Sequence, residues 1–282
     1  MKKLTYLCIE LEKLADIRTL TKEQLIAQLE QLGEKPFRAK QIYEWLWQKS
    51  AVDFDDMTNL SKDLREKLKA HFSILPISVY KVQQSNDGTI KSAFQLHDKH
   101  LIEGVMIPTE DRATACVSSQ VGCSLTCSFC ATGFLKRERN LTAAEIYDQV
   151  VLINNQTQKS IGKNLTNIVF MGMGEPLLNY SNVLSAIDKI TSEDGLNMSA
   201  KRITVSTAGI AKMIKKLADD NVRFNLALSL HAADDEKRQG DDEHLSGPRA
   251  GHGRRHTHSK FRQRFLQRIS NCDLPWLQSR AA

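Results

Sequence analysis

Three closely spaced cysteines constrain this chain more than any other feature of its sequence. Cys123, Cys127 and Cys130 form a C-x3-C-x2-C pattern, so one short loop can offer three thiolates to a single inorganic centre. A structural zinc site or an electron-transfer iron–sulfur cluster usually takes four protein ligands. A cubane held by only three leaves one iron with an open coordination position. The spacing therefore indicates a centre at which substrate chemistry can take place.

The spacing alone leaves other roles for these cysteines open. One is a zinc knuckle completed by Cys116 or by a distant histidine. A disulfide knot is disfavoured, because we find no secretory leader and no transmembrane run, and thiols in a cytosolic protein stay reduced. A cluster of thiols without any function is the third alternative.

The charge distribution is weak evidence for a nucleic-acid partner. The 282 residues carry a net charge of +6, but residues 239–282 hold eight Lys or Arg against four Asp or Glu. Most of the positive excess therefore lies in the tail, and bulk charge says little about RNA binding here. The length allows one large domain or two small ones, and the hydrophobic fraction of 41% is ordinary for a globular protein.

Residues 1–75 predict a small helical module. Thr21 followed by Gln24 indicates a capping box, and Gly33 marks the end of that helix. Further helices are expected at 39–49 and from Ser61 onward. We interpret their tryptophan-containing stripe as core rather than as a base-stacking platform, although the basic run 33–40 keeps nucleic-acid binding open. The expected apolar stripes contain Leu25, Ile26, Leu29, Leu32, Ile42, Tyr43, Leu46, Trp47, Leu64, Leu68 and His71.

Residues 76–110 predict a β-meander that leads to the cysteine loop. Glu103 lies in its last strand among apolar residues. On the residues alone, the better interpretation is that this glutamate is one of the solvent-facing residues of an alternating strand. The expected strands are 77–84, 89–96 and 101–107, joined by turns at 85–88 and 97–100.

From residue 115 onward, strands alternate with helices, which predicts a parallel sheet with right-handed crossovers. Chemically useful residues follow several strands, and this carboxyl edge is where parallel α/β proteins build sites. Gly172 and Gly174 would let the backbone approach a ligand, and the Glu175 carboxylate could bind an amino group. The expected strands are 115–119, 167–171, 202–206 and 222–230, and the expected helices are 142–154, 181–191 and 210–219.

Several segments resemble the RlmN-type dual-specificity RNA methyltransferases, which are radical S-adenosylmethionine (SAM) enzymes. The cysteine spacing, with Phe129 before the last cysteine, is the signature of that superfamily. The resemblance covers about residues 33–238 and implies an α/β fold, a partial (β/α)6 barrel of about four strands. The segments are GEKPFRA (33–39), RATACVSSQVGC (112–123), FMGMGEPL (170–177), STAG (206–209) and LSLHA (228–232). The implied domains are a helical accessory domain at 1–75, the meander at 76–110, a radical SAM core at 111–238 and a non-family tail at 239–282.

This resemblance implies the cofactors and the reaction. Cys123, Cys127 and Cys130 would bind a [4Fe–4S] cluster whose open iron chelates S-adenosyl-L-methionine. One cofactor molecule methylates a cysteine near the C-terminus, and a second yields an adenosyl radical that takes a hydrogen from that methyl group. The carbon radical then adds to carbon 2 of an adenine, which is electron-poor and accepts a radical readily. The cofactor-binding residues would be Gly174, Glu175, Ser206, Ser229, Leu230 and His231.

The resemblance also assigns two catalytic residues and the partners. Cys116 would attack the sulfur that holds the bridged methylene, forming a disulfide that releases the product; without the resemblance, a buried cysteine acting as a small hydrophobe is the simpler interpretation. Glu103 would accept the ring proton. The implied partners are 23S rRNA, tRNA and an electron donor such as a flavodoxin-type reductant. A monomeric cytoplasmic enzyme without membrane contact is expected.

The tail, residues 239–282, has a different composition from the rest of the chain. It holds four of the eight histidines and shows no strand or helix period at 247–259. We interpret it as unrelated to the family, for example as translated outside the ancestral reading frame; a His-rich metal-binding tract is the alternative. The last two barrel strands, a cofactor-binding Asn and the methyl-carrying cysteine would then be absent, because the setting of Cys272 does not match. Three hypotheses result: a carbon-2 methyltransferase, a carbon-8 methyltransferase, or a non-catalytic product that binds iron–sulfur or zinc.

Overall fold

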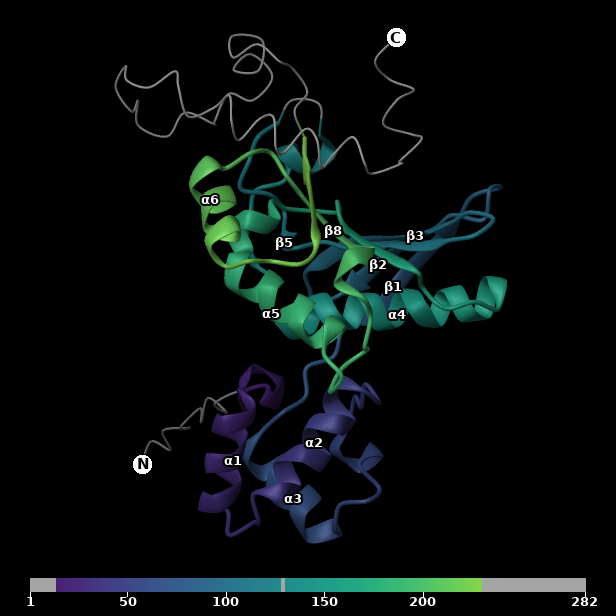
Figure 1. The fold of residues 1–282 in the computed structure, drawn as a ribbon. Coiled ribbons are helices and arrows are strands. Elements are labelled where there is room, and N and C mark those ends of the chain that lie inside the picture. Colours follow the sequence, from purple (N-terminus) through teal and green to yellow (C-terminus); the bar gives the residue numbers. More distant parts are fainter. Residues whose placement is uncertain (1–13, 128–129, 230–282) are drawn as a thin grey trace, which may run out of the picture. The chain divides into compact units, whose positions relative to one another are not determined.

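The computed structural model describes residues 14–127 and 130–229. In this part of the chain a helical bundle precedes a mixed sheet that is flanked by three further helices (Figure 1). The helices are α1 (Lys22–Gln31), α2 (Phe37–Trp47), α3 (Lys62–His71), α4 (Ala143–Ile161), α5 (Tyr180–Thr191) and α6 (Ala211–Asp219). The strands are β1 (Ser78–Gln84), β2 (Ile90–Gln95), β3 (Leu101–Pro108), β4 (Ala113–Cys116), β5 (Gln120–Val121), β6 (Arg139–Asn140), β7 (Asn167–Phe170), β8 (Ile203–Thr207) and β9 (Asn225–Leu228).

Helices α1 and α3 begin directly after the capping residues Thr21 and Ser61, whereas α2 begins at Phe37 rather than at the expected residue 39 and has no side-chain cap. Thr21 accepts a hydrogen bond from the backbone N–H of Gln24, whose side chain accepts one from the Thr21 N–H, so the predicted capping box is confirmed. Trp47 is 1% exposed, which confirms its assignment to the core. The prediction for His71 was wrong: it is exposed, and its Nδ1 lies 2.8 Å from the carbonyl oxygen of Lys67.

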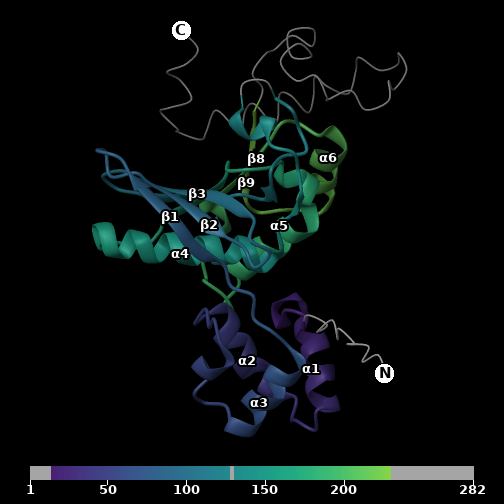
Figure 2. The same cartoon turned by 180° about the vertical axis from the view of Figure 1, so that it is seen from behind.

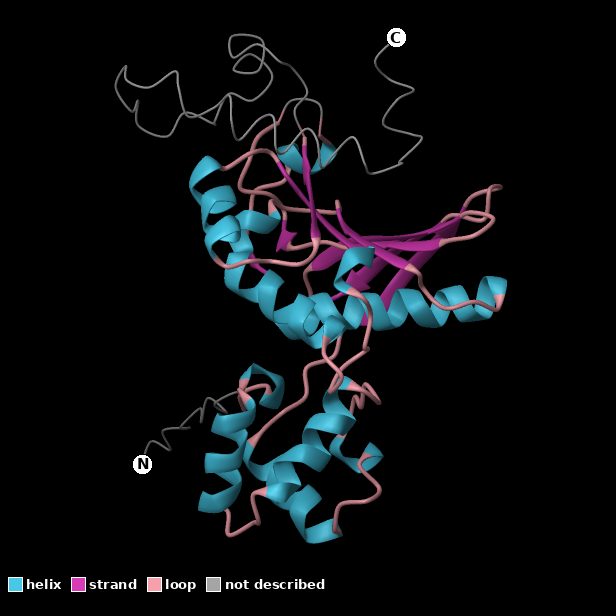
Figure 3. Ribbon diagram, viewed as in Figure 1, coloured by secondary structure: helices cyan, strands magenta, loops and turns pink. Residues whose placement is uncertain are grey.

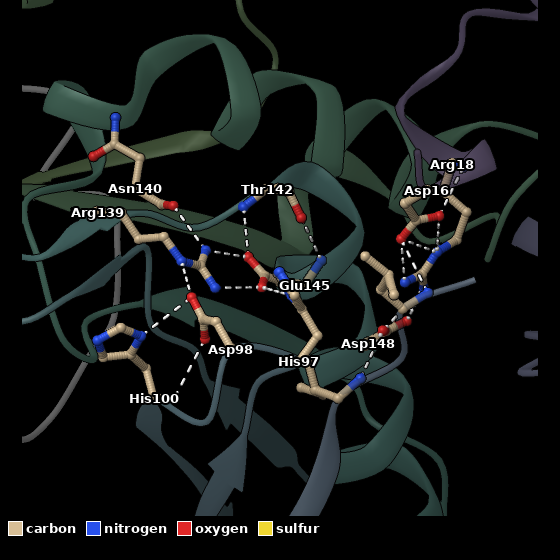
Figure 4. A network of polar contacts seen from close by, with 12 residues as sticks. Asp16, Arg18, His97, Asp98, His100, Arg139, Asn140, Thr142, Glu145 and Asp148 are labelled. Carbon is tan, nitrogen blue, oxygen red and sulfur yellow. Dashed lines mark hydrogen bonds and ion pairs between the residues drawn. The ribbon is translucent and has the colours of Figure 1, made fainter. Parts of the chain in front are cut away.

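A buried ion-pair cluster joins the helical bundle to α4. The Arg18 guanidinium contacts Asp16 at 2.9 Å and Asp148 at 2.7 Å (Figure 4). Beside it, the rings of Trp47 and Tyr147 meet edge to face at 5.0 Å. The Tyr147 hydroxyl donates a hydrogen bond to the Trp47 carbonyl. A buried charge is tolerated only when it is paired and hydrogen-bonded, and the fork of Arg18 meets both conditions.

The main sheet has seven strands in the order β1-β2-β3-β4-β7-β8-β9. Strands β1 to β4 are antiparallel, and β4, β7, β8 and β9 are parallel. The predicted meander and the four predicted parallel strands are therefore present, and they form one continuous sheet. The first parallel strand ends at Cys116 rather than at 119, and the last begins at Asn225 rather than at 222.

Burial alternates along the central strands, so the sheet has one covered face. Helices α4 and α5 lie along this face (Figures 1 and 2), and Figure 3 shows them as a separate layer from the strands. The opposite face holds partly buried or exposed residues such as Glu103, Val105 and Cys116. The covered face contributes Ile102, Met106, Ala113, Ala115, Ile168, Phe170, Ile203 and Val205 to the core. Among the described residues, no helix is long and apolar enough to span a membrane.

Candidate functional site

The cysteine loop leaves the carboxyl end of β4. The chain passes through the short strand β5, carries Cys123, Cys127 and Cys130, and returns through β6, which pairs antiparallel with β5. The Cys130 N–H donates to the Cys127 carbonyl at 3.1 Å, and the Gly133 N–H donates to the Cys130 carbonyl at 2.9 Å. A Cβ at Gly133 would lie 2.5 Å from the Cys127 carbonyl oxygen. Glycine is therefore required for the loop to close this tightly.

In the described part of the chain the three loop cysteines form no disulfide bond, and each is partly buried. Cys123 lines a pocket of about 630 Å³ together with Lys136 and Arg137. Burial raises the pKa of the Cys123 thiol, and the nearby charges of Cys130 and Glu175 act in the same direction. Within residues 14–127 and 130–229, no three His, Cys, Asp or Glu side chains gather as ligands of a single metal ion.

This donor set fits an iron–sulfur cluster. A four-iron cluster takes each thiolate on a different iron, so its ligands need not meet at one point. Three cysteines on one loop, with Cys123 lining a pocket, meet that requirement. The backbone N–H of Leu125 already donates to the Cys123 sulfur at 3.4 Å. Such N–H···S hydrogen bonds tune the reduction potentials of iron–sulfur clusters.

Glu175 is buried where the exits of β7 and β8 meet. Its side chain is held by two backbone amides: Oε1 accepts from the Leu177 N–H at 3.0 Å, and Oε2 accepts from the Ala208 N–H at 2.8 Å. Burial raises the pKa of this carboxyl group, and the two amide bonds oppose the shift. Each carboxylate oxygen keeps further acceptor capacity, so binding of a ligand amino group is chemically feasible and stays a prediction.

The two glycines before Glu175 permit a close approach within the chain itself. A Cβ at Gly172 would lie 2.8 Å from the Val117 carbonyl oxygen. A Cβ at Gly174, which has a φ of +94°, would lie 2.5 Å from the Cβ of Gln120. The expected approach to a ligand is untested, but these contacts explain why neither position accommodates a side chain. The β7 exit and the segment after β4 are packed backbone to backbone.

Two serines lie at the ends of neighbouring parallel strands. The hydroxyl oxygens of Ser206 on β8 and Ser229 after β9 are 3.1 Å apart, and the Ser229 N–H donates to the Thr207 carbonyl at 2.9 Å. The sheet thus brings these two predicted cofactor-binding residues together. Leu230 and His231 lie outside the described residues, as do the predictions for the tail.

Glu103 and Cys116 lie on the same, uncovered face of the sheet. Val105 is directly opposite Cys116 in the β3–β4 register, and Glu103 is two residues before Val105. The Glu103 carboxylate is half exposed and pairs with Lys91 at 2.8 Å, as expected for the outward half of an alternating strand. Burial raises the pKa of the Cys116 thiol to about 11, so this thiol is protonated at neutral pH.

Sequence reasoning missed a set of buried polar residues directly before the cysteine loop. Ser118, Ser119 and Gln120 are at most 1% exposed. Asn179 joins this segment to the chain near α4 by donating to the carbonyl oxygens of Ser119 and Leu141, both at 2.8 Å. The sequence did contain a signal for these residues, namely three consecutive polar residues between a strand and Cys123. Buried polar groups need hydrogen-bond partners, so such a run indicates a dedicated polar network.

A second polar network holds β6 in place. The Arg139 guanidinium donates to Asp98 at 2.6 Å and to both oxygens of Glu145 at 2.8 and 2.7 Å (Figure 4). Although burial opposes it, hydrogen bonds from Arg139 and His100 hold the pKa of Asp98 well below its usual range. Glu145 also completes the capping box of α4 with Thr142. The returning strand of the cysteine loop is thereby tied to α4 and to the β2–β3 turn.

Family models match both halves of the described structure. The model of the ribosomal RNA large subunit methyltransferase N-terminal domain matches residues 15–74. The model of the radical SAM superfamily matches residues 117–265, which is more than half of the chain. The second match extends past the boundary expected at residue 238, and that boundary stays a prediction. The chain belongs to the radical SAM superfamily.

Individual relatives agree with this assignment. A probable dual-specificity RNA methyltransferase RlmN from Cytophaga hutchinsonii is 61% identical over 222 residues, covering 79% of this chain and 61% of the relative. A probable RlmN from Christiangramia forsetii is 58% identical and covers 83% and 66% of the two chains. The chain therefore spans about three-fifths to two-thirds of the length of these curated relatives.

A solved structure shows the same fold. The crystal structure of a radical SAM methyltransferase from Sphaerobacter thermophilus aligns with a TM-score of 0.74 at 41% identity, covering 81% of this chain and 67% of that chain. The predicted α/β radical SAM fold is confirmed. As a radical SAM protein, the chain has a [4Fe–4S] cluster and S-adenosylmethionine as its cofactors.

Proposed function

We propose that this chain forms the cofactor-binding body of an RNA methyltransferase that methylates carbon 2 of adenosine in 23S rRNA and in tRNA. The observation that carries the proposal is the placement of the cysteine loop, Glu175 and Ser206 at the carboxyl ends of neighbouring parallel strands. The relatives named as dual-specificity RNA methyltransferases support the substrate class. Because the chain spans only part of the length of these relatives, we propose the complete reaction for a protein that also contains the remaining part of their length.

In this proposal the chain holds its two cofactors with two groups of residues. Cys123, Cys127 and Cys130 bind the cluster. The second group, which binds S-adenosylmethionine, consists of the residues that the family resemblance implies. When bound, the cluster and S-adenosylmethionine supply the methyl group and the one-electron chemistry. Glu175 is suited to a ligand ammonium group. Burial raises the pKa of its carboxyl group and so disfavours the charged form, and a positively charged partner would stabilise that form. The cofactor-binding residues are Gly174, Glu175, Ser206, Ser229, Leu230 and His231.

Glu103 and Cys116 act on the RNA side of the site. Glu103 is half exposed and forms an ion pair with Lys91. Its carboxylate can therefore accept a proton from a substrate on the uncovered face. The Cys116 thiol, with its pKa raised to about 11, stays protonated until a base is brought to it. This protects the thiol from oxidation before substrate arrives, because the thiolate is the reactive form.

The helical module is proposed to contact the RNA. Phe37 is 54% exposed at the start of α2, and the Arg38 guanidinium lies 4.9 Å from its ring centroid. An exposed ring beside a cation is suited to an unstacked base and its phosphate. We further propose a flavodoxin-type electron donor, a monomeric state and a cytoplasmic location, where free thiols stay reduced.

A non-catalytic product that binds iron–sulfur or zinc is the second candidate. It is favoured by the tail composition, in which the methyl-carrying cysteine is not recognised. A carbon-8 methyltransferase is the close rival within the enzyme class.

One experiment separates these candidates. The chain is joined at residue 238 to the C-terminal part of the Cytophaga relative, reconstituted anaerobically, and incubated with reductant, cofactor and a 23S rRNA fragment. Mass spectrometry of the digested RNA should show 2-methyladenosine for the joined chain. A methyl group on carbon 8 would contradict the proposed position. A joined chain that binds its cluster but leaves the RNA unmodified would contradict the enzyme proposal.

A further inference from the structure

Gln120 is a buried amide between the cysteine loop and the strand exit that carries Glu175. It is 0% exposed and begins β5. Its Oε1 accepts the backbone N–H of Glu175 at 3.0 Å and that of Ser124, the neighbour of Cys123, at 3.4 Å. Its Nε2 donates to the Asn140 side-chain oxygen at 2.8 Å and to the Ser124 hydroxyl at 3.2 Å. One side chain thus bonds to both parts of the proposed site.

The partners of Gln120 require an amide. Its oxygen receives two backbone N–H groups, and its nitrogen faces the oxygens of Asn140 and Ser124. A carboxylate of the same shape would have no proton to donate to Asn140. An apolar side chain of similar length would leave the Glu175 and Ser124 amides without this acceptor.

The aliphatic part of Gln120 is also fixed in place. A Cβ at Gly174 would lie 2.5 Å from the Gln120 Cβ and 2.6 Å from its Cγ. The Gln120 N–H donates to the Met173 carbonyl at 3.2 Å. The β7 exit is therefore packed directly on the stem of Gln120, and the amide group cannot swing away from its partners without moving Glu175.

We propose that Gln120 is a positioning residue that fixes the cysteine loop relative to Glu175, so that one cofactor molecule can reach both. This inference rests on the proposed function, in which the cysteines hold the cluster and Glu175 binds the amino group of the cofactor. A ligand held at two points binds tightly only when the points keep their separation, and such placement depends on supporting hydrogen bonds. Gln120 provides that support through its bonds to the backbone N–H groups of Ser124 and Glu175.

Gln149 offers a matched control. It is also 0% exposed, and its amide bonds to both the N–H and the carbonyl of Ser118, at 2.8 and 3.1 Å. It lies on α4 and contacts neither Ser124 nor Glu175 in these bonds. Gln149→Met therefore removes a buried amide of the same kind from the same protein without releasing the cysteine loop.

The test follows cofactor binding rather than turnover. The 282-residue chain and its Gln120→Met and Gln149→Met variants are reconstituted anaerobically with iron and sulfide. Iron content is measured, the cluster is reduced, and its EPR signal is titrated with S-adenosylmethionine. We expect equal iron in all three proteins. The cofactor concentration that gives half of the EPR shift should rise about tenfold or more in Gln120→Met and stay within about twofold in Gln149→Met.

Two results would overturn the inference while leaving the proposed function intact: a Gln120→Met titration equal to wild type, or an equal rise in Gln149→Met. If the wild-type cluster formed but its signal ignored the cofactor, the proposed function itself would fail, and this inference with it.

A second variant keeps the test decisive if Gln120→Met does not fold. Gln120→Glu retains an acceptor for the Glu175 amide and loses donation to Asn140 and Ser124. It should bind wild-type iron and need an elevated cofactor concentration, smaller than that of Gln120→Met where both can be measured. A Gln120→Glu titration that coincides with wild type would contradict the requirement for an amide.

Discussion

The two faces of the seven-stranded sheet carry different kinds of residue, although the same strands build both. On β3, Ile102 and Met106 are 0% exposed against the helices, whereas Glu103 between them is half exposed on the other side. On β4, Ala115 is fully buried, and Cys116, the next residue, faces the uncovered side. The alternation of a β-strand separates the two sets.

This difference assigns the two faces different tasks. The helix-covered face supplies hydrophobic stabilisation, which grows with the apolar area removed from water. The uncovered face and the carboxyl edge hold the titratable and nucleophilic groups, whose partners are local hydrogen bonds. Substitutions on the first face should therefore change stability, and substitutions on the second should change chemistry.

The largest effect is expected where the site depends on thiolates. Cys123→Ala should lose nearly all bound iron after anaerobic reconstitution, because two remaining thiolates do not hold a cubane. Cys116→Ala should retain wild-type iron, because Cys116 belongs to the sheet face rather than to the loop. Iron and sulfide analysis of the two variants measures this contrast. Equal iron loss in both would show that Cys116 is a ligand.

A pair of substitutions on β3 compares the two faces within one strand. Met106→Ala should lower the free energy of unfolding by about 3 kcal/mol, because it leaves a cavity in the core. Glu103→Ala should change it by less than about 0.5 kcal/mol, because an exposed ion pair contributes little. Urea unfolding followed by circular dichroism gives both values. A Glu103 variant as destabilised as the Met106 variant would refute the assignment of the faces.

The Cys116 thiol should react slowly with alkylating reagents. Its pKa is raised to about 11 by burial, so at pH 8 the thiolate fraction is about a hundredfold below that of an ordinary thiol. The alkylation rate should rise about tenfold per pH unit and level off near pH 11, since only the thiolate reacts. Mass spectrometry of the Cys116 peptide measures this rate. Fast alkylation at pH 8 would exclude the buried, neutral thiol.

The smallest contrast is expected between two glycines with positive φ. Gly162→Ala should cost about 1 kcal/mol, because the new Cβ meets open space and only backbone strain remains. Gly174→Ala should cost about 3 kcal/mol, because the Cβ also collides with Gln120. Thermal unfolding of both variants gives the difference. Equal costs would mean that the β7 exit and Gln120 are not in close contact.

Local signals made much of this fold predictable. The capping box at Thr21, the start of the helix at residue 142 and the alternating strands depend on neighbouring residues, and each appeared where expected. The end of α4 did not: the helix continues past residue 154 to Ile161, where Gly162 adopts a left-handed conformation. The last turns of α4 are polar, and the Gln156 amide there bonds to the buried Ser92 hydroxyl on β2. That partner is distant in sequence and could not be foreseen.

The candidate site divides in the same way. The cysteine spacing and the strand exits were readable from the sequence because each is a local pattern. The role of Gln120 was not, because it depends on Ser124, Asn140 and Glu175 meeting in space. The contact of Gly174 with Gln120 was likewise not readable from the sequence, and the expected approach of Gly174 to a ligand stays a prediction. Polar contacts between residues that are distant in the sequence were thus the part of the site that local sequence patterns could not predict.

The most direct test of the account is whether the carboxyl edge of this sheet builds a cluster with an open iron. The wild-type chain would be reconstituted anaerobically with iron and sulfide, reduced, and measured by EPR before and after addition of S-adenosylmethionine. We predict a reducible [4Fe–4S] cluster whose signal shifts when the cofactor is added. No cluster, or a cluster whose signal ignores the cofactor, would contradict it.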